Sequence, residues 1–386
     1  MSERGFHPPG ARKRVKPIAI DVRVPVQTLS YPVIIGRGVI GLLGEELQRS
    51  YLAPTRVALI SDDNVFPLHG DAVQGSLEQQ GLRVVPIVIA AGEASKRVPV
   101  LLDVARQLLR AGFGRGDAVV ALGGGVVGDL AGLAAALFMR GIPVIQCPTS
   151  LLAQVDASVG GKVAVDLPEG KNLLGAFHFP LAVFIDPEFL TTLDDRQLAS
   201  GLAEMLKHGA LFSPEHFSQL VDSADAFFDR DLQAIAPLIA ASVSLKAACV
   251  GRDPWEQSSA GKGRVLLNFG HTVGHAIEVA SGYTLAHGEA VALGMRAAAR
   301  ITRAKGLAGP ELEQTFVSAL ACLRLPTDLD HWLSGERGKA VERALAQDKK
   351  RSDGKVSFVA LSQIGDPSVI SLNFRELFAR LRPETA

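Results

Sequence analysis

Short runs of β-branched and aliphatic residues alternate with helical patterns through the first half of this 386-residue chain. Each apolar run ends in polar residues or glycine, and helices fit between successive runs, as at 98–110 and 128–139. Continuously apolar strands separated by helices are typical of a parallel sheet that is covered on both faces. The sequence therefore predicts an α/β domain with a parallel, Rossmann-like sheet. The expected strands are 57–60, 84–89, 118–122, 144–146 and 182–185.

Helical patterns dominate after about Leu193. The expected helices are 198–212, 232–250, 272–280, 288–305 and 311–323, followed by strands at 355–361 and 368–372 and a closing helix. We therefore expect three parts, with a ligand site between the last two. They are a flexible tail at 1–18, an α/β domain at 19–193 and a mostly helical domain at 194–386.

The composition favours a cytoplasmic protein that binds neither nucleic acid nor membrane. Basic and acidic residues balance at 40 each, so no overall charge attracts such partners. Cys147, Cys249 and Cys322 are scattered among apolar neighbours, which predicts reduced thiols rather than disulfides or a thiolate metal site. We see no secretory signal, and the apolar runs are too short to span a bilayer.

The glycine-rich segment 123–128 fits the pattern GxGxxG between a predicted strand and a helix that starts near Asp129. Such glycines allow the backbone to approach a pyrophosphate, and the helix N-terminus supplies free N–H groups. The acid expected about twenty residues later is missing, because Gln146 stands there. Asp62, at the end of a predicted strand, is the alternative ribose ligand. A tight strand-to-helix turn without a ligand is the competing interpretation.

Three histidines within seventeen positions predict a metal site in the helical half. His271 and His275 are four residues apart and share one helix face, and His287 begins the next predicted helix. Glu204 is the carboxylate of an apolar predicted helix and the best candidate for a further ligand. Histidine nitrogens and a carboxylate suit zinc or a similar divalent ion. Each residue alone can instead be ordinary core packing or a helix ion pair.

Lysines beside paired glycines suggest an anion site between the two domains. Lys162 follows Gly160 and Gly161, and Lys171 follows Gly170, which suggests a loop wrapped around an anion. A solvated charged face is the usual alternative, and it explains 349–351 better than it explains Lys162. Further cations in apolar surroundings are Lys246, Arg264, Lys349 and Lys350.

Seven motifs in order, from about Tyr31 to the C-terminus, resemble the 3-dehydroquinate synthase family. They are GGGVVGDLAG, PTSLLAQVDASVGGK, GKNLLGAFH, GLAEMLKHG, NFGHTVGHAIE, HGEAVALGM and DKK. The wider relatives are the sugar-phosphate cyclases and, more remotely, metal-dependent polyol dehydrogenases. The resemblance implies a dehydroquinate synthase-like fold, with an NAD-binding α/β domain and a helical domain that binds metal and substrate.

The activity implied by the resemblance is a carbon–oxygen lyase reaction of the shikimate pathway. It converts 3-deoxy-D-arabino-heptulosonate 7-phosphate into 3-dehydroquinate and phosphate. The sequence of steps is transient oxidation by NAD, phosphate elimination, re-reduction and an intramolecular aldol reaction. The implied cofactors are NAD and a divalent metal, zinc or cobalt.

The resemblance also assigns residues to each ligand. The implied metal ligands are Glu204, His271 and His287. The phosphate and the rest of the substrate would be bound by Lys162, Lys171, Asn172, Asn268, His275 and a lysine of Lys349 and Lys350. The substrate carboxylate would be bound by Lys246 and Arg264. The implied NAD contacts are Asp62, Asn64, Glu93, Lys96, Gly124, Gly125, Asp129, Thr149, Ser150, Lys162, Lys171, Thr192 and Leu193.

The implied catalytic residues are Asp156, Lys162, Lys207, Asn268 and His275. Asp156 and Lys207 would lie around the reacting hydroxyls, and His275 would bind phosphate and transfer a proton.

Two further positions concern assembly and a departure from the family pattern. Arg140 matches a substrate-binding arginine that approaches from a partner subunit, which implies a homodimer. Gln197 stands where the family pattern leads us to expect glutamate.

Four alternatives remain. The substrate of sedoheptulose 7-phosphate cyclases has no carboxylate, so Lys246 and Arg264 argue against them. His275 argues the same way, because those relatives usually lose the second histidine of the motif. An amino-dehydroquinate cyclase keeps the carboxylate and stays open. A metal- and NAD-dependent polyol dehydrogenase is less favoured, because a neutral polyol gives these cations no anion to bind. A non-catalytic relative is disfavoured because every candidate ligand is present.

Overall fold

The computed structural model describes residues 30–49, 56–258, 263–349 and 355–381. The tail expected at 1–18 and the candidate Lys350 lie outside the described residues, as does the side chain of Lys349. The fold begins with a six-stranded, wholly parallel sheet in the order β1-β8-β5-β4-β2-β3. In sequence order its strands are β1 (Val33–Ile35), β2 (Arg56–Asp62), β3 (Arg83–Ile89), β4 (Ala118–Gly123), β5 (Val144–Pro148) and β8 (Ala182–Ile185).

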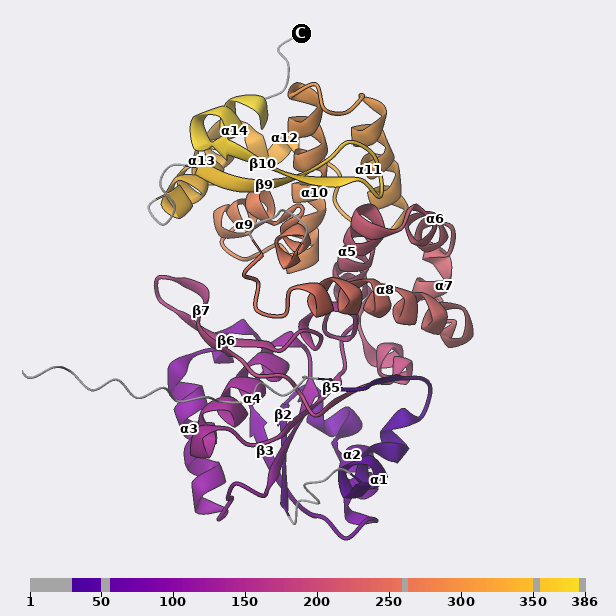
Figure 1. The fold of residues 1–386 in the computed structure, drawn as a ribbon, viewed down its shortest axis with the longest axis vertical. Coiled ribbons are helices and arrows are strands. Elements are labelled where there is room, and N and C mark those ends of the chain that lie inside the picture. Colours follow the sequence, from indigo (N-terminus) through magenta and orange to yellow (C-terminus); the bar gives the residue numbers. More distant parts are fainter. Residues whose placement is uncertain (1–29, 50–55, 259–262, 350–354, 382–386) are drawn as a thin grey trace, which may run out of the picture. The chain divides into compact units, whose positions relative to one another are not determined.

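This sheet confirms the predicted α/β architecture. Alternate side chains of β2 enter two different cores, because successive residues of a strand point to opposite faces. Ala58 and Ile60 pack under α3 (Val98–Arg110) and α4 (Gly125–Leu137), whereas Val57 and Leu59 pack under α1 (Leu43–Arg49) and α2 (Asp71–Glu78). Figure 1 shows these two helix pairs on either side of the sheet.

Two details of this half differ from the sequence prediction. Helix α4 begins at Gly125, three residues before the predicted start, so two of the glycines form its first turn. Residues 162–177 form an antiparallel hairpin, β6 (Lys162–Leu167) and β7 (Gly170–Phe177), rather than a loop. The hairpin forms because Val163 and Val165 alternate with more exposed residues and enter the core beside α4.

The second half is mostly helical, as predicted. Its helices are α5 (Asp195–Phe212), α6 (Pro214–Asp222), α7 (Ala224–Phe228), α8 (Leu232–Arg252), α9 (His271–Ala280), α10 (His287–Ala304), α11 (Glu311–Cys322), α12 (Asp330–Leu333), α13 (Gly335–Lys349) and α14 (Phe374–Leu381). The strands β9 (Lys355–Leu361) and β10 (Pro367–Asn373) pair antiparallel. Since β8 ends at Ile185 and α5 begins at Asp195, we retain 19–193 and 194–386 as a proposed division into domains.

Within the described residues, α8 alone is long and apolar enough to meet the length and composition criteria of a membrane-crossing helix. Its side chains Ile235, Ile239 and Val243 are buried in the same core as those of α5 and α10. The apolar composition of α8 is therefore that of a partly buried core helix.

Helix α10 lies unusually close to α5 and α9, and glycine makes this possible. A Cβ atom on Gly288 would lie 2.1 Å from the backbone oxygen of Ser200 in α5. A Cβ atom on Gly294 would lie 1.8 Å from the backbone oxygen of Gly270, the residue that precedes α9. No side chain fits at either place unless the backbones separate. These contacts fix the N-terminal ends of α9 and α10 against the middle of α5.

We expect Gly294→Ala to lower the free energy of unfolding by about 1–3 kcal/mol, because the added methyl group overpacks a backbone contact. Gly251→Ala in α8 is the matched control, since a Cβ atom there meets nothing within 4 Å. Helix propensity should leave the control unchanged or stabilise it by up to about 1 kcal/mol. Urea unfolding measures both, and equal stability of the two variants would contradict the close-contact argument.

Candidate active site

Glu204, His271 and His287 converge where the three helices meet. Glu204 lies in the middle of α5 and is fully buried, while the two histidines are the first residues of α9 and α10. Oε1 of Glu204 lies 3.6 Å from Nε2 of His271 and 3.3 Å from Nε2 of His287. Candidate ligand atoms of the three residues lie within 4.8 Å of one another. Two imidazoles and one carboxylate with a remaining open position suit a catalytic divalent ion.

The two candidate histidine ligands differ in protonation state. Burial lowers the pKa of His271 to about 3, so its ring is neutral, as a metal ligand requires. Its Nδ1 donates to the carbonyl of Phe269 at 3.1 Å, which leaves Nε2 directed at Glu204. Burial alone would lower the pKa of His287, but Glu204 and Glu278 outweigh it and raise the pKa to about 9. A metal ion bound there would therefore displace a proton.

Two other groups of potential ligands lie nearby in the described part of the chain. The first comprises His275, Glu278 and His287, and the second comprises Asp156, Glu204 and His208. The second group already contains ammonium partners, because Lys207 pairs with Glu204 and Lys246 lies 2.7 Å from Asp156. Lys246 neutralises Asp156 without a metal, and Glu204 is common to both groups, so the group that pairs Glu204 with His271 and His287 is the best candidate.

Asp156 is the centre of a buried polar network beside the metal candidate. Burial alone would raise the pKa of Asp156, but Lys246 and Lys207 outweigh it and hold the pKa well below its usual range. Nε2 of His208 lies 3.6 Å from this carboxylate, and Nδ1 of the same ring hydrogen-bonds to Ser242 at 2.8 Å. The structure therefore brings the predicted residues Asp156, Lys207 and Lys246 together.

Arg264 is buried next to this network. Its Nη1 donates to the carbonyls of Gly160 at 2.8 Å and Pro254 at 3.0 Å, and burial lowers its pKa. Its Nε is buried and has no hydrogen-bond partner within the described structure. A buried guanidinium N–H without a partner is costly, and an anionic ligand would accept its hydrogen bond.

The predicted phosphate-binding residues lie on the β6–β7 hairpin and on α9. Lys162 pairs with Glu256, and Lys171 lies 2.8 Å from Glu278 and 3.4 Å from Glu93. Asn172 has a positive φ of 56° and accepts a hydrogen bond from Lys96 through its side chain. Both lysines thus have carboxylate partners.

Asn268 and His275 lie on either side of His271 in the sequence. Asn268 ends a short 3-10 helix three residues before His271. The ring of His275 is exposed and lies 5.1 Å from the ring of His271, centroid to centroid. The structure therefore brings His275 to the cluster without making it part of the favoured ligand group.

The predicted NAD residues gather at the carboxyl end of the sheet, where ligands bind in such folds. Asp62 ends β2, Gly124 follows β4, and Thr149 and Ser150 follow β5. A Cβ atom on Gly124 would lie 3.4 Å from Oγ of Ser150. One carboxylate oxygen of Asp62 already has protein partners. Its Oδ1 accepts hydrogen bonds from the backbone N–H groups of Asn64 and Val65, which closes the turn after β2.

Other predicted NAD residues pair among themselves or with their neighbours. Lys96 and Asp129 form an ion pair at 2.6 Å, and Thr192 lies 2.9 Å from Nε2 of His69. Gly125 opens α4, and Leu193 directly precedes the N-cap of α5.

Arg140 and Gln197 lie at exposed places. Met139, Arg140 and Gly141 have φ values of 51°, 70° and 116°. The backbone is strained at Met139 and Arg140, because residues with side chains rarely adopt positive φ. Gln197 lies in the first turn of α5, where its backbone N–H bonds to the capping residue Asp194. The side chain of Gln197 is exposed and takes no part in this cap, so glutamine in place of the expected glutamate leaves the helix start intact.

Sequence reasoning gave no separate role to Glu278, which contacts both Lys171 and His287. Its position three residues after His275 on α9 was the available signal. Burial alone would raise the pKa of Glu278, but His287 and Lys171 outweigh it and lower the pKa to about 2.

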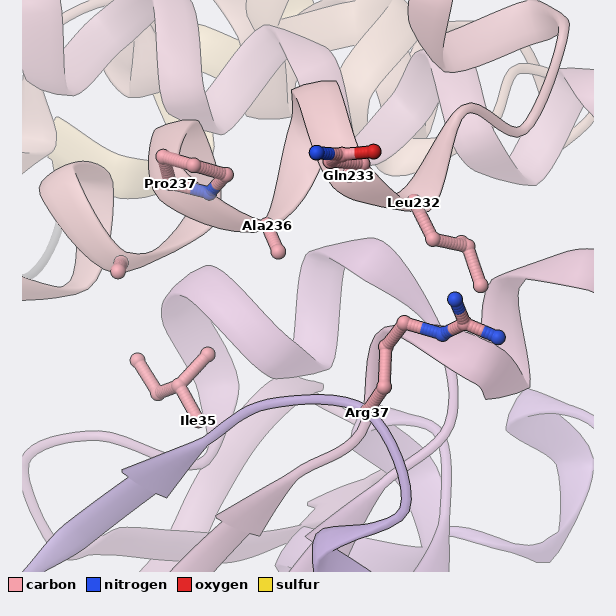
Figure 2. Close-up of a pocket in the computed structure, with 7 residues that line it drawn as sticks. Ile35, Arg37, Leu232, Gln233, Ala236 and Pro237 are labelled. Atoms are coloured by element: carbon pink, nitrogen blue, oxygen red, sulfur yellow. The ribbon is translucent and has the colours of Figure 1, made fainter.

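A separate cavity of about 410 Å³ lies between β1 and α8 and contains none of the predicted residues. Figure 2 shows Ile35 and Arg37 facing α8 across it. Its lining residues are Ile35, Arg37, Leu232, Gln233, Ala236, Pro237 and Ala240.

The parallel sheet, the helical second half and the buried histidine–carboxylate cluster together define the sugar-phosphate cyclase fold. A 2-epi-5-epi-valiolone synthase from Streptomyces hygroscopicus, with NAD⁺ and Zn²⁺ bound, matches with a TM-score of 0.82 and 28% identity over 93% of this chain and 98% of its own. A 2-deoxy-scyllo-inosose synthase complexed with carbaglucose-6-phosphate, NAD⁺ and Co²⁺ matches with a TM-score of 0.79 and 25% identity, covering 91% and 96%.

Sequence comparison identifies the particular family within this class. The models for the N-terminal and C-terminal parts of 3-dehydroquinate synthase match residues 86–200 and 201–351. The 3-dehydroquinate synthase of Symbiobacterium thermophilum is 44% identical over 85% of this chain and 90% of its own. The 3-dehydroquinate synthase of Caulobacter vibrioides is 43% identical over 88% of this chain and 92% of its own. The chain belongs to the 3-dehydroquinate synthase family and has the lyase activity of that family.

The two histidines of α9 offer a matched test of the ligand group. We expect Zn²⁺ to raise the melting temperature of the wild type and of His275→Asn, but not that of His271→Asn. Ligand binding at 100 times its dissociation constant stabilises a fold by about 2.7 kcal/mol. Differential scanning fluorimetry of the metal-depleted proteins measures the shift. The opposite pattern, loss in His275→Asn alone, would favour the group of His275, Glu278 and His287.

Proposed function

We propose that the chain converts 3-deoxy-D-arabino-heptulosonate 7-phosphate into 3-dehydroquinate and phosphate, using NAD and one divalent ion, zinc or cobalt. It would act in the cytoplasm as a homodimer. The observation that carries the proposal is the convergence of Glu204, His271 and His287 beside two buried cations, Lys246 and Arg264. A metal group and cations together suit a substrate that is both a polyol and an anion.

Glu204, His271 and His287 would hold the divalent ion, which when bound would act as a Lewis acid on hydroxyl and carbonyl oxygens of the substrate. Lys207 supports this group by pairing with Glu204, and the carboxylate raises the pKa of Lys207 despite its burial. Lys207 therefore stays charged and keeps Glu204 ionised. The two cyclases with bound Zn²⁺ or Co²⁺ that share this fold support the choice of metal.

The carboxyl end of the sheet would hold NAD, which would accept a hydride and return it to the same carbon, so that no net oxidation occurs. The glycine-rich start of α4 and the adjacent residues Thr149 and Ser150 suit a pyrophosphate, because free N–H groups and a hydroxyl face the same place. The NAD⁺ bound in both cyclases supports this assignment.

Lys246 and Arg264 would bind the substrate carboxylate. Both side chains are buried and burial lowers the pKa of each, so a substrate carboxylate beside them would add to the pairing of Lys246 with Asp156. The unpartnered Nε of Arg264 supplies a free donor. This pair favours the proposed substrate over sedoheptulose 7-phosphate, which has no carboxylate. An amino analogue that keeps the carboxylate would bind to the pair equally well.

The phosphate end of the substrate would lie between the hairpin and α9. Lys162, Lys171 and Asn172 would bind phosphate oxygens from the hairpin, and Asn268 and one of Lys349 and Lys350 would be further ligands. His275 is exposed beside the metal candidate, so its imidazole can bind phosphate and move a proton. Asp156 would orient a reacting hydroxyl.

Arg140 supports the proposed homodimer. It lies on the strained turn after α4, where the apolar side chains Leu137 and Met139 are 59% and 39% exposed. A partner subunit that covers this turn would bury the apolar side chains and receive the arginine. Analytical ultracentrifugation tests the assembly, and a monomer at micromolar concentration would contradict it.

Phosphate release from 3-deoxy-D-arabino-heptulosonate 7-phosphate, with catalytic NAD and Zn²⁺, tests the reaction. We expect one phosphate per substrate with no net absorbance at the NADH band, because the hydride returns to its carbon. Accumulating NADH would contradict the cyclase reaction and favour a dehydrogenase. The fold is shared with a butanol dehydrogenase from Thermotoga maritima at 16% identity and a TM-score of 0.67, so this outcome is the relevant alternative.

Arg264→Ala should raise the KM for this substrate about 10–100-fold, the expected loss for a hydrogen bond to a charged group. Arg37→Ala is the matched control, because Arg37 is exposed and pairs with Glu188 away from the cluster. Steady-state kinetics measures both variants. An unchanged KM in Arg264→Ala would remove its assignment to the carboxylate.

A further inference from the structure

Glu278 connects the β6–β7 hairpin to the candidate metal centre. Its side chain is 6% exposed, and its Oε1 accepts a hydrogen bond from Nζ of Lys171 at 2.8 Å. Its Oε2 lies 3.6 Å from Nδ1 of His287. A buried carboxylate held between a lysine and an imidazole has little freedom to turn.

Each candidate histidine ligand needs a partner that fixes the orientation of its ring. A metal-binding imidazole is normally oriented by a hydrogen bond at its second nitrogen. In His271 this bond exists, since Nδ1 donates to the carbonyl of Phe269. In His287 the corresponding Nδ1 faces Oε2 of Glu278, while Nε2 faces Glu204 at 3.3 Å.

We propose that Glu278 is a positioning residue that accepts the Nδ1–H of His287 and so directs Nε2 of this ring at the metal. The inference rests on the metal group of the proposed function. The present separation of 3.6 Å slightly exceeds hydrogen-bond length, so a small side-chain movement on metal binding completes the contact.

Lys171 fixes Glu278 from the opposite side. Its ammonium group also lies 3.4 Å from Glu93 and 4.7 Å from the centre of the Tyr283 ring. Since Lys171 belongs to the proposed phosphate-binding set, Glu278 joins the phosphate end of the site to a metal ligand. Removal of Glu278 therefore affects His287 directly, whereas Glu93 contacts Lys171 and has no contact with His287 in the described structure.

The test measures Zn²⁺ affinity of the full-length, metal-depleted protein by competition with a chromophoric chelator, without substrate. We expect Glu278→Ala to weaken Zn²⁺ binding about 10–100-fold, the usual effect of losing such a supporting group. Glu93→Gln is the matched control and should stay within about twofold of wild type, because no contact joins it to His287 in the described structure. The visible spectrum of the Co²⁺-loaded protein should change in Glu278→Ala alone, since it reports the ligand geometry.

Unchanged Zn²⁺ affinity in Glu278→Ala would overturn the inference, as would an equal loss in Glu93→Gln, which indicates a general charge effect. If Glu278→Ala does not fold, Glu278→Gln carries the same test, because it keeps the side-chain size but can accept through only one oxygen. A wild type that binds no Zn²⁺ at all would instead refute the metal group of the proposed function.

Discussion

The backbone contact of α10 with α5 and α9 is the constraint on which the candidate metal centre depends. Packed helices normally stay 8–10 Å apart because side chains separate them. At Gly288 and Gly294 no side chain intervenes, and the backbones of Ser200 and Gly270 occupy the space. His271 and His287 therefore begin their helices within reach of Glu204. The backbone contacts determine where the three helices that carry the ligands lie, and side-chain contacts then orient the rings.

Burial of charge is the second constraint on the site. Carboxylates that are buried require cations, and Glu204 with Lys207 and Asp156 with Lys246 satisfy each other beneath the metal candidate. The hairpin lysines have carboxylate partners as well, Lys171 with Glu278 among them. An anionic substrate must therefore compete with protein carboxylates for these lysines, which favours ligands that carry more than one negative charge.

Much of the fold could be predicted from the sequence, because continuously apolar strands and helical periodicity are local signals. Strand β1 gives no sequence signal because three residues show no periodicity, and the glycines Gly160 and Gly161 predict a loop where the β6–β7 hairpin forms. The spacing of His271 and His275 predicted a shared helix face but not which ring meets Glu204. The contact between Lys171 and Glu278 spans 107 residues, and no local pattern encodes such a pairing.

Anomalous diffraction at the zinc edge from crystals of the Zn²⁺-loaded protein tests the central claim most directly. The account predicts one strong peak within bonding distance, about 2.0–2.2 Å, of Glu204, His271 and His287. A peak bound instead by His275 and Glu278, or by Asp156 and His208, would contradict it, as would a fully loaded protein with no peak among these helices.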